Sequence, residues 1–147
     1  MNAQAILSLI YSLAVQEQMD GNLMAAVAIT ESELNPNAKG SRGETGLFQI
    51  RANATKLTHK QLLDPISNAR EGIRILKEAS VKCKFNLDNT FPVCYNFGYH
   101  GAGKLKSPYV IYLRRVLHQY EIQRGRYSMG TATLGERLYG KSDLHSQ

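Results

Sequence analysis

A glutamate at the end of an apolar helical stripe is the first candidate for chemistry. Met24, Val27, Ala28 and Glu31 are spaced i, i+3, i+4 and i+7, so a helix places them on one face. Burial costs a carboxylate free energy unless it is neutral or hydrogen-bonded. We therefore expect Glu31 to keep its proton more readily than an exposed glutamate, as a general acid must. The alternatives are a buried glutamate that holds a neighbouring loop and a glutamate at the solvated end of the helix.

A proline and a set of glycines follow this helix. The helix must stop near Asn35-Pro36, because proline disfavours the α conformation in the residue before it. Glycines at 40, 43 and 46 then allow a tight loop whose backbone can approach a ligand closely. The apolar segment 47–50 follows, and Gln49 is its one polar residue. The order is helix, acid, glycine loop and buried return segment.

This order resembles the first signature of the soluble-lytic-type lytic transglycosylases, lysozyme-like muramidases related to the goose-type lysozymes. Their pattern is E-S-x-x-N-P-x-A, a loop with Ser and Gly, and then G-L-x-Q-I. The matching residues are Glu31, Ser32, Asn35, Pro36, Ala38, Ser41, Gly43, Gly46, Leu47, Gln49 and Ile50.

Two later segments also resemble this family. The first matches the family's D-P-x-x-N-x-x-x-G-x-x-x-L element, for which we expect a scaffolding role, and the second is similar to its A-Y-N-A-G motif. The residues are Asp64, Pro65, Asn68, Gly72 and Leu76 in the first, and Cys94, Tyr95, Asn96, Phe97 and Gly98 in the second. The resemblance covers roughly residues 5 to 120.

The fold that the resemblance implies is mainly α, a lysozyme-like α+β fold with at most a small β-hairpin within residues 38–51 and a cleft between helices. We expect residues 1–125 to form the lysozyme-like domain and residues 126–147 to be a partly flexible C-terminal extension. Periodicity and capping signals predict helices over residues 3–18, 22–34 (with Asn22 as its cap), 58–63, 65–82, 91–97 and 107–124.

The resemblance also implies a reaction, the cleavage of the β-1,4 bond between N-acetylmuramic acid and N-acetylglucosamine with 1,6-anhydromuramic products. Glu31 would act first as acid and then as base. Ser32 would orient Glu31 or bind the substrate, and Gln49, Tyr95 and Asn96 would orient the sugar. Tyr112 lies in a segment similar to the family's last motif, so we expect it near the cleft or, alternatively, in the core.

Two other functions stay open. Glycosidases that use water need two carboxylates about 5 to 9.5 Å apart, and Glu44 would be the second if the chain were a hydrolytic lysozyme. The alternative for Glu44 is a loop residue paired with Arg42. The other function is a non-catalytic cell-wall-binding module of a phage particle or secretion apparatus.

The composition indicates which class of partner the chain binds. The 147-residue chain carries a formal net charge of +6 with a pI near 9.4, which favours an anionic partner. No nucleic-acid motif accompanies the basic residues, so peptidoglycan glycan strands are the expected partner and nucleic acid is not. The histidines are scattered, and neither they nor Cys83 and Cys94 have the spacing of metal ligands, so we predict no metal or cofactor. The two cysteines are either free thiols or joined in one disulfide.

The sequence also bears on location. No apolar segment reaches the roughly 18 residues that a membrane span needs, and the first residues lack the pattern of a secretion signal. We expect action on peptidoglycan in the periplasm or cell wall. The chain would be virion-associated, exported by a secretion complex or preceded by a leader outside this sequence.

Overall fold

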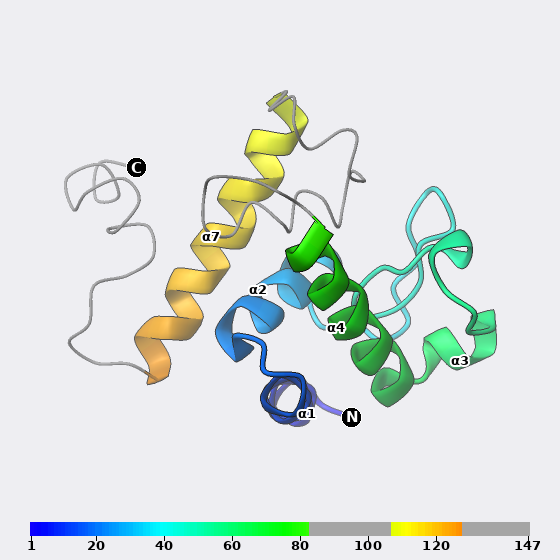
Figure 1. Cartoon of the computed structure of the whole chain (residues 1–147), viewed down its shortest axis with the longest axis horizontal. Coiled ribbons are helices and arrows are strands. Elements are labelled where there is room, and N and C mark those ends of the chain that lie inside the picture. Colours follow the sequence, from blue (N-terminus) through cyan, green and yellow to red (C-terminus); the bar gives the residue numbers. More distant parts are fainter. Residues whose placement is uncertain (83–106, 128–147) are drawn as a thin grey trace.

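The computed structural model describes residues 1–82 and 107–127, and this part of the chain is mainly helical (Figure 1). Its elements are α1 (Ala3–Gln16), α2 (Gly21–Ser32), the short 3-10 helix η1 (Ala52–Ala54), α3 (His59–Leu63), α4 (Pro65–Lys82) and α7 (Ser107–Tyr127). The only strand-like pairing in the described residues is two isolated antiparallel bridges, Lys39 with Thr45 and Thr45 with Ile50. The predicted hairpin is therefore reduced to these two bridges.

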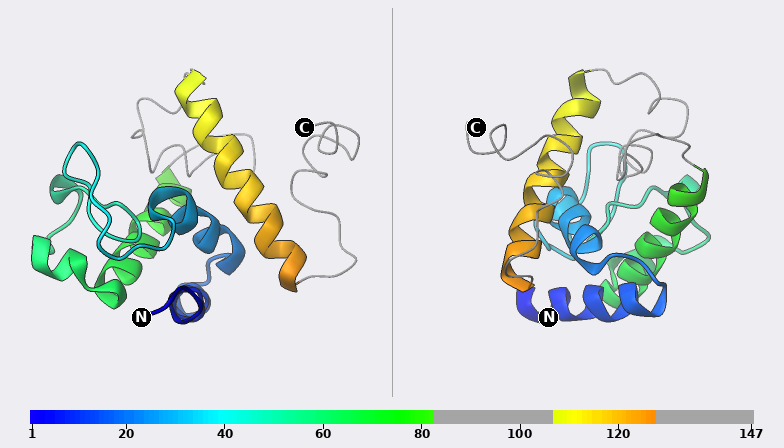
Figure 2. Two further views of the ribbon diagram at one scale, coloured as in Figure 1. Left: turned by 180° about the vertical axis from the view of Figure 1, so that it is seen from behind. Right: turned by 60° about the vertical axis from the view of Figure 1, so that its left-hand side comes forward.

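Helix α2 lies at the centre of the fold. Six successive residues, 23–28, are at most 2% exposed, so every side of the helix is covered there. Helix α7 packs along α2, and α1 contacts both α2 and α4. In the right-hand view of Figure 2, α1 runs across the bottom, below α7, α2 and α4. The helix that carries the candidate acid is therefore held from several directions.

The start of α2 differs from the prediction. Asp20 is the N-cap, and its carboxylate accepts hydrogen bonds from the backbone N–H groups of Asn22 (2.9 Å) and Leu23 (3.3 Å). The predicted cap, Asn22, is wrong, because its side-chain oxygen accepts a hydrogen bond from the Tyr11 hydroxyl instead (2.7 Å). Asp20 also accepts a hydrogen bond from Tyr120 of α7 (2.7 Å), so one carboxylate caps α2 and binds α7.

Both early helices end two residues before their predicted ends. Helix α1 stops at Gln16, and Gln18 adopts a left-handed backbone with φ 56° that turns the chain. Helix α2 stops at Ser32, because Glu33 and Leu34 have φ of 53° and 62°. The chain thus leaves the helical conformation before the Asn35-Pro36 signal.

Helices α3 and α4 have the predicted bounds, within one residue. Thr58 forms a capping box with Gln61 at the start of α3. In α4, Ala69, Ile73 and Leu76 are fully buried. A Cβ placed on Gly72 would overlap the Phe48 ring, so this glycine allows a close contact between α4 and the segment 47–50.

Helix α7 continues to Tyr127, so the predicted domain boundary after residue 125 falls inside its last turn. The predicted helix 91–97, residues 128–147 of the extension, and the two cysteines lie outside the described residues. Within the described ranges, no helix is both long and apolar enough to cross a membrane. In the same ranges, no three side chains of the metal-ligand type are grouped.

Candidate active site

Glu31 lies in the last turn of α2, just after the segment 23–28 that is buried on every side. Met24, Val27 and Ala28 are fully buried, as predicted from their spacing with Glu31. Glu31 itself is half-buried rather than enclosed. A half-buried carboxyl remains accessible to a substrate while its backbone is fixed by the buried part of the helix.

Ser32 is the last residue of α2 and is only 9% exposed. Its hydroxyl donates a hydrogen bond to the Ala28 carbonyl oxygen one turn earlier, at 3.0 Å. This bond uses the hydroxyl proton, so the group can act toward Glu31 or a substrate only as an acceptor.

The glycine loop folds back on itself after residue 38. Gly43 and Gly46 have φ of 82° and 78°, a conformation that favours glycine. The backbone N–H of Gly46 donates to the Ala38 carbonyl (2.8 Å), and Thr45 and Ile50 exchange a pair of backbone hydrogen bonds at 3.1 Å each. The loop is therefore closed by its own backbone.

Gln49 is held by this loop. Its backbone has a left-handed φ of 48°, and its side-chain amide nitrogen donates to the carbonyl oxygens of Ala38 and Gly46, both at 3.0 Å. A Cβ on Gly40 would come within 2.9 Å of the Gln49 amide oxygen, so that oxygen lies against Gly40. Both amide protons thus bind the loop, and the oxygen is the part of Gln49 left for a sugar hydroxyl or N–H.

Asn68 connects the loop to the helices behind it. Its side chain is fully buried, accepts a hydrogen bond from the Phe48 backbone N–H (2.8 Å), and donates to the carbonyls of Thr45 and Leu62, both at 2.8 Å. All three bonds serve backbone groups, which need hydrogen-bond partners when they are buried. Asn68 therefore fixes the segment that carries Gln49, the scaffolding role expected for its motif.

Glu44 is engaged in the loop. Its carboxylate accepts a hydrogen bond from the Arg42 backbone N–H (2.9 Å) and pairs with the Arg51 guanidinium (3.5 Å). Burial raises the pKa of this carboxyl, but hydrogen bonds from backbone N–H groups and the charges of Arg51 and Arg42 outweigh it, so the net pKa is lowered. The expected partner was Arg42; its backbone is used, and Arg51 supplies the side chain.

The remaining predicted residues are on α7 or outside the described part of the chain. Tyr112 is 8% exposed and belongs to the hydrophobic core, which favours the core alternative for this residue. Tyr95 and Asn96 lie outside the described residues, so the structure does not test their roles. Sequence reasoning missed the Asp20–Tyr120 contact; the Asp-Gly pair before α2 was the one available signal for a cap there.

Comparison with known proteins decides the family. Residues 8–107 match the family model described as the transglycosylase SLT domain. The chain belongs to this family. The predicted family and the mainly helical lysozyme-like fold are therefore confirmed. The family description, a transglycosylase domain, agrees with the predicted enzyme class.

Two solved structures share this SLT-domain fold. The 70 kDa soluble lytic transglycosylase of Escherichia coli is 20% identical with a TM-score of 0.73, over 82% of this chain and 24% of that protein. An inactive mutant of the lytic transglycosylase Slt of Pseudomonas aeruginosa is 18% identical with a TM-score of 0.74, over 91% and 25%. This chain thus spans about a quarter of each of them. A comparison with curated protein sequences finds no significant match.

Proposed function

We propose that this chain is a peptidoglycan lytic transglycosylase that cleaves the β-1,4 bond between N-acetylmuramic acid and N-acetylglucosamine. The observation that carries the proposal is Glu31, a half-buried carboxyl at the end of a buried helix, within the segment 8–107 that matches the SLT domain. The helix that carries Glu31 is covered on all sides along residues 23–28. The loop that follows it holds the Gln49 side chain by a hydrogen bond.

In the proposed reaction Glu31 serves twice. Its proton goes to the glycosidic oxygen as the bond to the anomeric carbon breaks, and the acetamido group of the substrate assists at that carbon. The resulting carboxylate then takes the proton of the C6 hydroxyl while the C6 oxygen bonds to the anomeric carbon. The products are a 1,6-anhydromuramic end and a free sugar hydroxyl, and Glu31 regains its proton without consuming water.

The other residues have positioning roles in this proposal. Ser32 and the amide oxygen of Gln49 accept hydrogen bonds, and Tyr95 and Asn96 bind sugar hydroxyl and N-acetyl groups. Tyr112, which lies in the core, has a supporting role and no direct contact with the sugar in this proposal. The net charge of +6 attracts the anionic wall polymer. The place of action is the periplasm or the cell wall, because the substrate is there; carriage by a phage particle or a secretion complex stays a prediction.

Glu31→Gln is the variant that tests the proposal. It keeps the shape of the side chain but carries no transferable proton, so glycan release should fall by about 100-fold or more. The matched control is Glu33→Gln, which removes the same charge two residues away at an exposed position and should release glycan like wild type. If Glu31→Gln releases glycan as fast as Glu33→Gln, Glu31 is not the acid.

Mass spectrometry of the released fragments decides the chemistry. The proposal expects muropeptides that end in 1,6-anhydromuramic acid. Fragments with ordinary reducing ends would instead indicate a hydrolytic lysozyme, and a wall that is bound but left intact would indicate a binding module.

A further inference from the structure

A pocket of about 470 Å³ lies between the segment around η1 and one face of α4. Its volume is in the range of about 300 to 1,000 Å³ that is typical of ligand sites. None of its residues is a predicted site residue. The lining residues are Asn53, Ala54, Thr55, Lys56, Leu57, Glu71 and Arg74.

The wall formed by α4 is built around an ion pair. The Arg74 guanidinium donates two hydrogen bonds to the Glu71 carboxylate, at 2.7 and 3.1 Å, and a third to Glu78 at 3.3 Å. Thr55 links the opposite wall to this pair, because its hydroxyl donates to Glu71 (3.1 Å) and accepts from the Leu57 backbone N–H (3.1 Å). The two walls are thus fixed to each other before any ligand binds.

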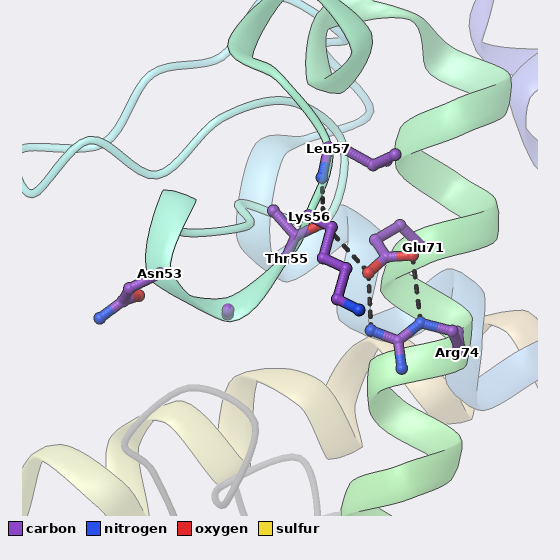
Figure 3. A pocket seen from close by; sticks show the side chains of 7 residues that line it. Asn53, Thr55, Lys56, Leu57, Glu71 and Arg74 are labelled. Atoms are coloured by element: carbon purple, nitrogen blue, oxygen red, sulfur yellow. Dashed lines mark hydrogen bonds and ion pairs between the residues drawn. The ribbon is translucent and has the colours of Figure 1, made fainter.

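Among the residues that line the pocket, Lys56 carries the unpaired positive charge. Arg74 pairs with Glu71 and, outside the lining, with Glu78, whereas the exposed Lys56 has no carboxylate partner in the described ranges 1–82 and 107–127. Figure 3 shows the Lys56 side chain extended toward the Glu71–Arg74 pair. Arg74 has five N–H donors, and the three bonds above leave two of them for a ligand. Lys56 and Arg74 therefore offer ammonium and guanidinium donors to one anionic group.

We propose that this pocket is a carboxylate-binding subsite that holds an acidic group of a wall fragment between Lys56 and Arg74. A carboxylate suits the site because it can take donors from both cations. Naming the wall as its source rests on the proposed function. Peptidoglycan carries such groups in its stem peptides and, where no peptide is attached, in the lactyl group of N-acetylmuramic acid.

The experiment measures binding, so it does not depend on turnover. Full-length protein labelled with ¹⁵N is titrated with N-acetylmuramoyl-L-alanyl-D-glutamate, with the diamide of this compound, and with N-acetylmuramic acid. Binding of the dipeptide alone identifies the stem peptide as the source, and equal binding of N-acetylmuramic acid identifies the lactyl group. Either result supports the subsite. Diamide binding as tight as that of the acid, or binding of no probe, overturns it.

Three variants localise the binding. Lys56→Gln should weaken it about two- to fivefold, the range of an exposed charge pair. Glu71→Gln should tighten it, because the pocket loses its negative charge. The matched control Lys60→Gln removes the same charge from exposed α3, outside the pocket, and should bind like wild type. Equal affinities of Lys56→Gln and Lys60→Gln overturn the proposal.

The two proposals fail separately. If the wild-type protein binds the acid through Lys56 but releases no anhydro fragments, the proposed function is wrong and the subsite proposal stands. If it releases anhydro fragments but Lys56→Gln binds the probes as tightly as wild type, the subsite proposal is wrong and the proposed function stands.

Discussion

Glu44 is the residue on which the choice between one and two catalytic carboxylates depends. Its acceptor sites are used by the Arg42 backbone N–H and the Arg51 guanidinium, and its side chain lies against Gly40 next to the Gln49 amide. These contacts fit the predicted alternative, a loop residue, and we propose that Glu44 shapes the loop and takes no part in the reaction.

We therefore predict that Glu44→Gln retains most of the turnover, within about fivefold of wild type. The amide can still accept from the Arg42 N–H, and only the attraction to Arg51 is lost, a contact at an exposed arginine that is worth about 1 kcal/mol or less. Turnover on purified peptidoglycan measures this. A loss of 100-fold or more would restore the two-carboxylate lysozyme.

Asn68→Ala should destabilise the protein by about 3 kcal/mol or more. The substitution removes three hydrogen bonds from the buried backbone groups of Phe48, Thr45 and Leu62, and a lost hydrogen bond costs about 1 to 3 kcal/mol where water cannot reach the group. Urea unfolding of Asn68→Ala gives the value, and exposed Asn37→Ala, within about 0.5 kcal/mol of wild type, is the control. Equal midpoints for the two variants would contradict the scaffolding role.

For single residues, the sequence predicts which side chains are buried better than it predicts their interaction partners. The spacing that puts Met24, Val27 and Ala28 on one face is a local property, and it predicts their burial correctly. The pairing of Glu44 with Arg51 instead depends on how the loop closes, which periodicity does not encode. Whether the Tyr112 ring faces a cleft or the core is decided by the packing of α7, which is also non-local.

The contact between α4 and the Phe48 ring depends on Gly72. Gly72→Ala should destabilise by about 1 to 3 kcal/mol, because the added Cβ overlaps the ring and overpacking outweighs the gain in helix propensity. Thermal unfolding measures this loss.

Gly125→Ala is the matched control on α7. A Cβ there meets no atom within 4 Å, so the same substitution should stabilise by up to about 1 kcal/mol. If the two variants shift the melting temperature in the same direction, Gly72 is not a packing glycine.

Helix bounds follow from the sequence where a cap or a proline lies at the boundary. Thr58 and Pro65 are such signals, and α3 and α4 begin next to them as predicted. The ends of α1 and α2 carry no comparable local signal, because non-glycine residues take the left-handed conformation there. Tertiary packing compensates that cost, so local propensity overestimates both lengths.

The response of the whole molecule to acid can be predicted from three carboxyls, within residues 1–82 and 107–127, whose pKa values are lowered. The pKa of Glu71 is lowered chiefly by the hydrogen bond from Arg74, and that of Asp64 by the hydrogen bond from the Ser67 backbone; Glu44 is the third. A lowered folded-state pKa stabilises the fold above the unfolded value, near pH 4, and this contribution is lost as the pH falls through the folded value.

We expect the melting temperature to be steady from pH 7 to about 5 and to drop below about pH 4. Calorimetry of wild type across this range checks the shape, and Glu71→Gln should lose less on acidification because it has no proton to gain. A melting temperature that rises on going from pH 5 to pH 3 would contradict the sign.

Asp20 and Tyr120 are 100 positions apart, yet one hydrogen bond joins them at the start of α2. While a nascent chain is still on the ribosome, α2 has left the exit tunnel long before the tyrosine that anchors it. The hydrogen bond at the start of α2 therefore cannot form until Tyr120 has also been synthesised and has left the tunnel.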